Sequence, residues 1–423
     1  MRERPPSVRI DDLADPQLPP HVVEIMQSVE PLAADLAFTL DAVADAASQE
    51  TGLGDFGEDW FREPIALVLR CLDEEAGLSA FGRMSSHAQM VGHLRNRLRV
   101  EHLVRTNPEI LEVEIERPIF IVGQPRTGTT HLHNLMAEDP ALRSLPYWES
   151  LEPVLSDAER PAVAGGAPDP RRERCAAGLE FLDEAMPLFK RMHDMTVDHV
   201  HEEIQLLALA GSTMLFETMA IMPTWRDWYR AHDQTPAYAY LKRALQCCQW
   251  LRGGERWVLK SPQHVEQIVP LLEIFPDATF VFTHRDPVSV IASTSTMISY
   301  TARSSQAKVD PPKIGHYWAD RVETMLRAGM RDHALLPEGR SIDVKFDQFM
   351  ADDLAMVQRI YDVADQPFTP EARTAMEAFM FDHPRGVHGG VAYDLEGDFD
   401  LDRTVLRDRL RDYTDRFDVA LES

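Results

Sequence analysis

The sequence predicts an α/β fold of three layers, in which helices cover both faces of a central parallel sheet and a helical region precedes it. An apolar run, Ile119–Val122, leads into a glycine-containing turn and then into a helix start. Two further runs, Trp257–Leu259 and Thr279–Phe282, have the composition of strands that are buried on both faces. Long segments with apolar residues at helical spacing lie between and before these runs.

The N-terminal region, residues 1–115, is expected to be helical. Apolar residues recur at helical spacing over 21–50, and the pattern continues over 58–72 and 88–104. We expect these helices to pack on the sheet or to form part of a binding pocket. The α/β domain is then expected to occupy residues 116–423.

A helical insert is expected over residues 173–252, between the first strand and the second. It follows a segment rich in Pro, Ala and Gly, 156–172, which is expected to be a loop. Such an insert would line a binding pocket, although helical aromatic residues are more often core. Its candidates for lining are Met219, Met222, Trp225, Trp228 and Tyr229. Further on, an alternating segment, 341–346, predicts a strand, and 400–419 predicts an amphipathic helix.

The turn after the first strand has the composition of a phosphate-binding loop. Gly123 and Gly128 allow a tight backbone path, and the first N–H groups of the helix that follows can bind an anion. The ATP-binding form of such a loop needs Lys after its second Gly. Thr129 stands there instead, and the cation, Arg126, lies inside the loop. The pattern favours a nucleotide with a single 5′-phosphate-like group.

Two later segments add cations at strand ends. Lys260 ends the second apolar run, and Arg285 follows the third. Ser293 lies eight residues beyond Arg285, about two turns into a helix that is expected to start near Pro287. Arg285 and Ser293 could therefore bind a second phosphate together.

Together these motifs resemble the sulfotransferases that use 3′-phosphoadenosine 5′-phosphosulfate (PAPS). The matching strings are Pro-Arg-Thr-Gly-Thr-Thr at 125–130, Val-Leu-Lys-Ser-Pro at 258–262, and His-Arg-Asp-Pro at 284–287 with Ser293 after five more residues. A late segment, 383–390, is similar to the Arg/Gly loop that closes over the 3′-phosphate. The likeness covers roughly residues 115–420 and points to the bacterial branch with a helical N-terminal region.

The resemblance implies a P-loop-like α/β domain, PAPS as sulfuryl donor and 3′,5′-diphosphoadenosine (PAP) as product. It places the 5′-phosphosulfate in the first loop and the 3′-phosphate on the Arg285 and Arg385 elements. An aromatic residue, Phe346, would lie near adenine or in the core. The expected cofactor-binding residues are Gln124, Pro125, Arg126, Thr127, Gly128, Thr129, Thr130, Arg285, Ser293, Arg385 and Gly386.

Sulfuryl transfer needs cations at the leaving oxygen and a base for the incoming hydroxyl. Arg126 and Lys260 are the expected cations, and no metal is needed in principle. Animal members of the family carry a Lys-Thr-His triplet with His as the base, whereas Ser261 and Pro262 follow Lys260 here. The base must therefore lie elsewhere.

Three residues are candidates for the base. At helical spacing Glu203 shares a face with apolar residues, which would raise its pKa and suit a general base. The string Glu-Glu-Ile-Gln at 202–205 is also similar to one in the heparan-type sulfotransferases, where the second Glu is the base. This likeness implies Glu203, with Glu202 in reserve. His264, four residues after Lys260, is the rival.

Two other functions stay open at this point. A kinase or NTPase of the P-loop class is disfavoured by Thr129 and by the lack of an evident magnesium-binding strand end. A non-catalytic protein that only binds the nucleotide is the second. The acceptor is expected to be a hydroxyl or amine of a small molecule, a lipid or a carbohydrate.

Net charge, cysteine content and hydropathy limit the classes of partner and the cellular location that we expect. The net charge of −26 argues against nucleic-acid binding, which needs a basic surface. Four cysteines in 423 residues do not form a disulfide framework. No signal peptide or membrane-spanning segment is evident, so no stable membrane insertion and a cytoplasmic location are expected. The oligomeric state is not indicated.

Overall fold

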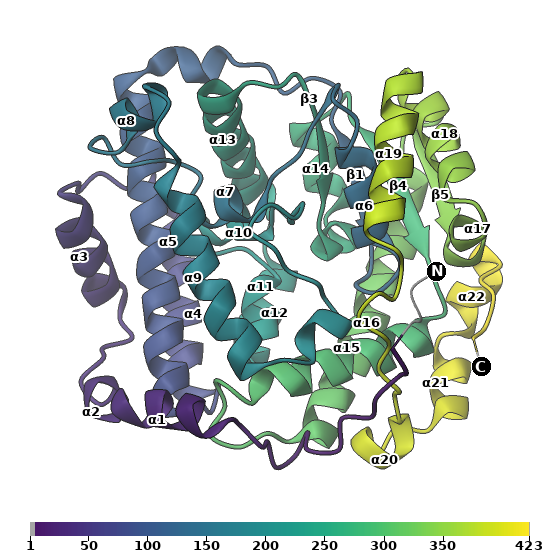
Figure 1. Ribbon diagram of the computed structural model, residues 1–423, viewed down its shortest axis with the longest axis horizontal. Coiled ribbons are helices and arrows are strands. Elements are labelled where there is room, and N and C mark those ends of the chain that lie inside the picture. Colours follow the sequence, from purple (N-terminus) through teal and green to yellow (C-terminus); the bar gives the residue numbers. More distant parts are fainter. Residues whose placement is uncertain (1–4, 423) are drawn as a thin grey trace.

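The computed structural model, which describes residues 5–422, has a five-stranded parallel sheet (Figure 1). The strand order is β2-β3-β1-β4-β5, and every neighbouring pair is parallel. This confirms the predicted α/β fold with a central parallel sheet. The strands are β1 (Ile119–Gly123), β2 (Leu142–Arg143), β3 (Arg256–Lys260), β4 (Thr279–His284) and β5 (Ser341–Lys345).

Alternate side chains of the central strands enter two separate hydrophobic cores. Ile119 and Ile121 of β1 pack in one core, whereas Phe120 and Val122 pack in the other. All four are fully buried. This burial on both faces explains why β1 is an unbroken apolar run rather than an alternating one.

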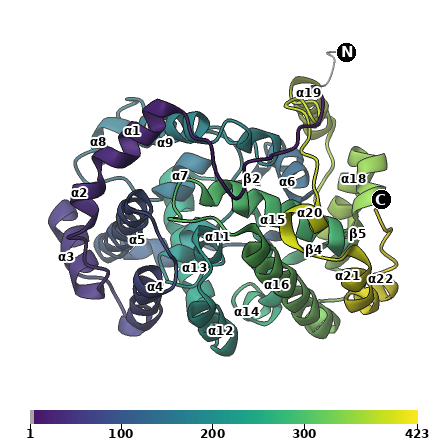
Figure 2. The same cartoon turned by 90° about the horizontal axis from the view of Figure 1, so that it is seen from below.

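Helices cover both faces of the sheet, which gives the three expected layers (Figures 1 and 2). The core with Ile119 includes residues of α6 (Thr129–Ala137), α17 (Phe346–Ala351), α18 (Asp353–Ala364) and α19 (Pro370–Asp382). The core with Phe120 includes residues of α13 (Thr235–Arg252), α14 (Ile268–Ile274), α15 (Pro287–Ala302) and α16 (Pro311–Asp332).

The N-terminal helices stand beside the sheet domain, at the left of Figures 1 and 2. They are α1 (Pro20–Ser28), α2 (Glu30–Ala33), α3 (Leu40–Thr51), α4 (Arg62–Glu74) and α5 (Ala80–Thr106). The pattern over 21–50 is thus divided among three helices. Thr39 caps the start of α3 by accepting from the Ala42 N–H, and Gly52 ends it with a φ of 71°. Whether residues 1–115 form a separate domain stays a prediction.

The helical insert expected over 173–252 begins within α9 (Pro170–Ala185) and continues through α10 (Ile204–Ala208), α11 (Leu215–Met219) and α12 (Pro223–Ala231) to the end of α13. Two short helices, α7 (Tyr147–Leu151) and α8 (Arg160–Ala164), precede it. The segment 156–172, expected to be a loop, contains the short helix α8. Within residues 5–422 there are also five 3₁₀ helices: Asp59–Phe61, Pro108–Glu112, Phe189–Arg191, Pro262–Glu266 and His333–Leu335.

The C-terminal part returns to the sheet domain through α20 (Leu395–Phe399), α21 (Arg403–Arg409) and α22 (Arg411–Phe417). The single helix expected over 400–419 is therefore broken at Leu410, whose side chain is buried. Val8 forms a parallel bridge with Val391, so the N-terminal segment lies beside the chain that follows the late loop.

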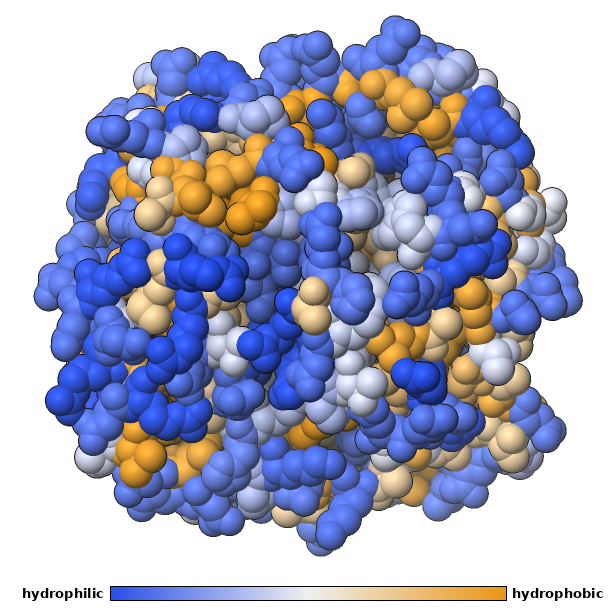
Figure 3. All heavy atoms as spheres, turned by 180° about the vertical axis from the view of Figure 1, so that it is seen from behind, coloured by the Kyte–Doolittle hydropathy of each residue, from blue (hydrophilic) through white to orange (hydrophobic). Residues whose placement is uncertain are grey.

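One face of the molecule is mostly hydrophilic. Figure 3 shows a face covered mostly by hydrophilic residues, with separate hydrophobic groups between them. No helix within residues 5–422 combines the length and the apolar character needed to cross a membrane. The four cysteines are free and buried.

Candidate active site

The predicted phosphate loop, Lys260 and Arg285 lie together at the carboxyl ends of the central strands. In the register of the strands, Ile121 of β1 lies beside Lys260, and Gly123 lies beside Thr283 of β4. All strands are parallel, so their carboxyl ends open toward the same side, where α/β sheets bind ligands. The fold therefore brings the phosphate loop together with Lys260 and Arg285, which lie 134 and 159 residues after Arg126 in the sequence.

The loop from β1 to α6 is held tightly by its neighbours. A Cβ on Gly123 would come within 1.7 Å of the Thr283 Oγ1. Thr127 shares a hydrogen bond of 2.7 Å with that same hydroxyl and donates to the Gln124 carbonyl at 2.8 Å. Gly128 has a φ of 83°, a conformation that favours glycine. The loop is thus fixed before any ligand binds.

Groups that suit an anion surround this loop. Leu132 is the first residue of α6 whose N–H meets a backbone acceptor, the Gly128 carbonyl, and Gly128 supplies no capping side chain. The preceding amides are available to a phosphate. Arg126 donates to the Ser293 hydroxyl at 2.9 Å and to the Met192 carbonyl. Among residues 5–422, no carboxylate pairs with Arg126, so this half-buried cation is available to neutralise a bound anion.

Lys260 points into the same region and forms an ion pair with Glu202. The Lys260 side chain is 3% exposed and the Glu202 side chain 17%. Both residues line one cavity together with Arg126, Thr129 and Thr130. A cation and a carboxylate therefore lie next to each other on the wall of this cavity.

Glu203 faces away from this cavity, contrary to the pattern expected from helical spacing. Helix α10 begins only at Ile204, so Glu203 precedes it and does not share its apolar face. The carboxylate is fully buried, accepts from the Lys260 N–H at 2.9 Å and pairs with the His264 ring. His264 is itself fully buried and hydrogen-bonds to the Tyr238 hydroxyl at 2.8 Å.

The expected rise in the pKa of Glu203 is wrong. Burial by itself would raise this pKa, but the charge of His264 and its hydrogen bond outweigh burial, and the pKa of Glu203 lies below its ordinary value. Glu203 and His264 thus form a buried pair beneath Lys260. Of the three base candidates, Glu202 is the one that lines the cavity.

Some of the residues expected at the 3′-phosphate lie together in the structure, and others do not. Arg285 lies 4.1 Å above the Phe346 ring and donates to the Arg126 carbonyl at 2.5 Å, so Arg126, Arg285 and Ser293 form one cluster. The Phe346 ring also packs closely against Gly128, because a Cβ atom on Gly128 would lie only 3.2 Å from that ring.

Arg385 lies outside this cluster in the structure. It pairs with Asp353 of α18 and donates to the Met350 carbonyl at 3.3 Å. Its neighbour Gly386 has a φ of 73°, which the turn after α19 requires. A role for the two residues at a phosphate stays a prediction.

Tyr393 is a site residue that the sequence did not indicate. Its hydroxyl accepts from the Ser293 hydroxyl at 2.9 Å, and Ser293 in turn accepts from Arg126. The only sequence signal was its position three residues after the Gly389-Gly390 pair of the late loop. The late loop thus reaches the cluster through Tyr393.

The cavity in front of Lys260 is large and mostly apolar. It has a volume of about 500 Å³ and is lined from the N-terminal region by Phe81, and from the insert by Phe181, Leu182 and Met186. Of the pocket-lining candidates named from the sequence, only Met219 reaches it. The others pack around α12: Met222, Trp225 and Tyr229 are buried in the core of the N-terminal helices, and Trp228 packs against that core.

The Glu422 carboxylate pairs with the Arg285 guanidinium, and it accepts from Nε at 2.6 Å and from Nη2 at 2.7 Å. We expect Glu422→Gln to tighten PAP binding by about two- to fivefold, because a partly exposed ion pair contributes about 0.2–1 kcal/mol that a phosphate would have to replace. Calorimetric titration with PAP checks this, and 5′-AMP serves as the control that should be unaffected. Weaker PAP binding would show instead that Glu422 holds Arg285 in its binding position.

Comparisons with known proteins agree with this geometry. Residues 118–370 match the model of the Sulfotransferase family. Omega-hydroxy-beta-dihydromenaquinone-9 sulfotransferases of Mycobacterium bovis and Mycobacterium tuberculosis are 30% identical over 187 residues, which is 42% of this chain and 44% of each relative. The match thus spans less than half of these curated relatives.

Two solved structures share the fold over nearly their whole length. Sulfotransferase STF9 from Mycobacterium avium has a TM-score of 0.81 and 27% identity, covering 92% of this chain and 99% of its own. Sulfotransferase STF1 from Mycobacterium tuberculosis H37Rv has a TM-score of 0.77 and 29% identity, covering 89% and 98%. The family model covers more than half of the chain and includes the phosphate loop, Lys260 and Arg285. This chain therefore belongs to the sulfotransferase family.

Proposed function

We propose that this protein transfers the sulfuryl group of PAPS to a hydroxyl of an acceptor held in the apolar cavity. The observation that carries the proposal is the convergence of the phosphate loop, Lys260 and Glu202 on that one cavity. A loop with free amides and a cation without a counter-ion suits the donor, and the adjoining apolar space suits the acceptor.

The residues divide into donor-binding and reacting groups. The amides at the start of α6 and the Arg126 guanidinium would bind the 5′-phosphate end of PAPS, and Arg285 with Ser293 would bind the 3′-phosphate. PAPS supplies a sulfuryl group whose bond to the 5′-phosphate breaks as its bond to the acceptor oxygen forms, giving a sulfate ester and PAP. Lys260 and Arg126 would stabilise the negative charge that builds on the phosphate.

Glu202 is the base that we propose. Its carboxylate faces the cavity and would take the proton of the acceptor hydroxyl. Its ion pair with Lys260 holds the two side chains next to each other before the substrates bind. Glu203 and His264 would act indirectly. Glu203 accepts from the Lys260 N–H and would hold the Lys260 backbone in place, and His264 pairs with Glu203.

The acceptor that fits best is a lipid-like molecule with a terminal hydroxyl. Apolar atoms form most of the exposed wall of the cavity, and its lining includes aromatic, leucine and methionine side chains that would contribute free energy by burying apolar surface of the acceptor. The curated mycobacterial relatives are named for a hydroxylated menaquinone acceptor, which is a molecule of this kind. A screen of candidate acceptors would show whether an amine or a carbohydrate is used instead. A cytoplasmic location stays a prediction from the sequence.

Calorimetric titration without magnesium tests the donor site. We expect PAP to bind at least tenfold more tightly than 5′-AMP or ATP, because Arg285 and Ser293 would add charged hydrogen bonds to the 3′-phosphate, worth about 1.5–3 kcal/mol each. Arg285→Met should reduce PAP affinity toward that of 5′-AMP and leave 5′-AMP unchanged.

The same titration separates the alternatives. Tight, magnesium-dependent ATP binding would contradict the proposal and favour a kinase or NTPase. Equal binding of PAP and 5′-AMP would remove the 3′-phosphate site from the proposal. Selective PAP binding without transfer of label from radiolabelled PAPS to any lipid, phenol or sugar alcohol would favour a non-catalytic nucleotide-binding protein.

A further inference from the structure

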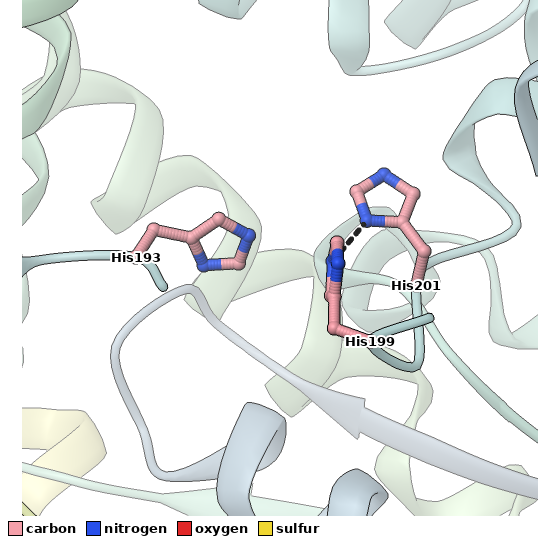
Figure 4. Close-up of side chains that lie close together, drawn as sticks. All are labelled: His193, His199 and His201. Carbon is pink, nitrogen blue, oxygen red and sulfur yellow. Dashed lines mark hydrogen bonds between the residues drawn. The ribbon is translucent and has the colours of Figure 1, made fainter. Parts of the chain in front are cut away.

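Three histidines lie together on the wall of the cavity, outside the groups that transfer requires. His193, His199 and His201 come from the loop between the 3₁₀ helix Phe189–Arg191 and α10. One ring nitrogen from each lies within 4.8 Å of the other two (Figure 4). His193 and His201 line the cavity itself.

From this cluster we propose that the protein binds one divalent transition-metal ion of the Zn²⁺ class, with these three imidazoles as ligands and a fourth position open to the cavity. Zn²⁺ sites of this type use three protein ligands at about 2.0–2.1 Å and leave one position for water or substrate. Imidazole nitrogen selects Zn²⁺ and its neighbours over Mg²⁺ and Ca²⁺, which prefer oxygen ligands.

The first argument is the spacing of the nitrogens. The His199 Nε2 and the His201 Nδ1 are 3.0 Å apart (Figure 4). Ligands at that bond length on a tetrahedral ion are about 3.4 Å from each other, so this pair needs only a small adjustment. Figure 4 shows the His193 ring turned toward the other two across the remaining gap.

The second argument is the hydrogen bond on the far side of His199. Its Nδ1 lies 2.7 Å from the Thr196 carbonyl oxygen. The Thr196 N–H also approaches Nδ1, at 3.3 Å, so the Thr196 backbone holds this nitrogen and Nε2 is the one that faces His201. A ring protonated at Nδ1, donating across the shorter contact, would present its Nε2 lone pair to the other histidines. Such a bond from the second ring nitrogen fixes the tautomer and orientation of metal-binding histidines. Tyr147 packs against both the His199 and His201 rings and holds them in place.

The third argument is that hydrogen bonds within the protein leave the cluster incompletely satisfied. Within residues 5–422 the His193 ring has no hydrogen-bond partner in the protein, and the His201 ring is hydrogen-bonded only to His199.

A second cluster in the protein shows the contrasting case. Asp343 accepts hydrogen bonds from His284 and His333, both at 2.8 Å, and the other nitrogen of His284 bonds to the Tyr413 hydroxyl at 2.9 Å. These histidines already have partners, so this cluster is a structural network and offers a matched control.

Metal titration of the full chain, after removal of metal by a chelator, tests the proposal. We expect one Zn²⁺ per chain by calorimetry and, with Co²⁺ in its place, a visible spectrum of a tetrahedral ion. His193→Gln and His199→Ala should each weaken Zn²⁺ binding by at least about a hundredfold, since loss of an outer partner alone costs about 10–100-fold. His193→Gln removes no hydrogen bond, so its fold should be retained, which thermal unfolding verifies.

His333→Gln is the control and should bind Zn²⁺ as the unaltered chain does. No Zn²⁺ uptake by the unaltered chain, or equal uptake by the His193→Gln and His199→Ala variants, would overturn the proposal. Loss of the ion in His333→Gln alone would assign it to the second cluster and equally refute the proposal. Neither PAPS nor an acceptor is present, so the result does not depend on the proposed transfer.

Discussion

Glu202→Gln is expected to lower the turnover of sulfuryl transfer by about 10²–10⁴-fold, the contribution of a well-placed general base. Glutamine keeps the size of the side chain and its contact with Lys260, but it cannot take a proton. PAP affinity should change little, because in the proposed arrangement the donor phosphates would contact the loop and Arg285 rather than Glu202. Steady-state rates with radiolabelled PAPS, together with PAP calorimetry, measure both quantities.

The control for this prediction is Glu180→Gln, the same change at an exposed position of α9. It should leave turnover and thermal stability unchanged. A Glu202→Gln variant with normal turnover but weaker PAP binding would contradict the role of a base. It would show that Glu202 acts only by holding Lys260 through their ion pair.

Glu203→Ala is expected to destabilise the folded protein by about 3–5 kcal/mol, which is the cost of removing one partner of a buried ion pair. The His264 ring would lose its carboxylate in a fully buried position, and the Lys260 N–H would lose its acceptor. Glu203→Gln should cost less, because an amide oxygen can still accept from that N–H. Urea unfolding measures both variants, with Glu180→Ala as the control.

Acid should also separate these variants. Since the pKa of Glu203 is lowered in the folded protein, its carboxylate contributes stability that is fully present above the ordinary glutamate pKa of about 4.3. This stability is lost as the pH falls through the folded pKa. Glu203→Gln should lack this acid-dependent part. Equal stability of Glu203→Ala and the unaltered chain at pH 7 would contradict the structural role.

The sequence by itself determined the parts of the site that are local. The apolar run of β1, the two loop glycines and the start of α6 are contiguous, so their spacing fixes a strand, a tight turn and a helix start without reference to the rest of the chain. The strand ends at Lys260 and Arg285 were predictable for the same reason. The parallel sheet order then places these strand ends beside the phosphate loop.

Only the tertiary structure decided which of two adjacent carboxylates faces the acceptor. Helical spacing favoured Glu203, but α10 begins one residue later, and the buried His264 draws Glu203 away from the cavity. The contact of Glu422 with Arg285 and the histidine cluster likewise depend on how separate segments pack. A side chain's direction outside regular structure follows from its long-range partners, and local periodicity carries no information about those partners.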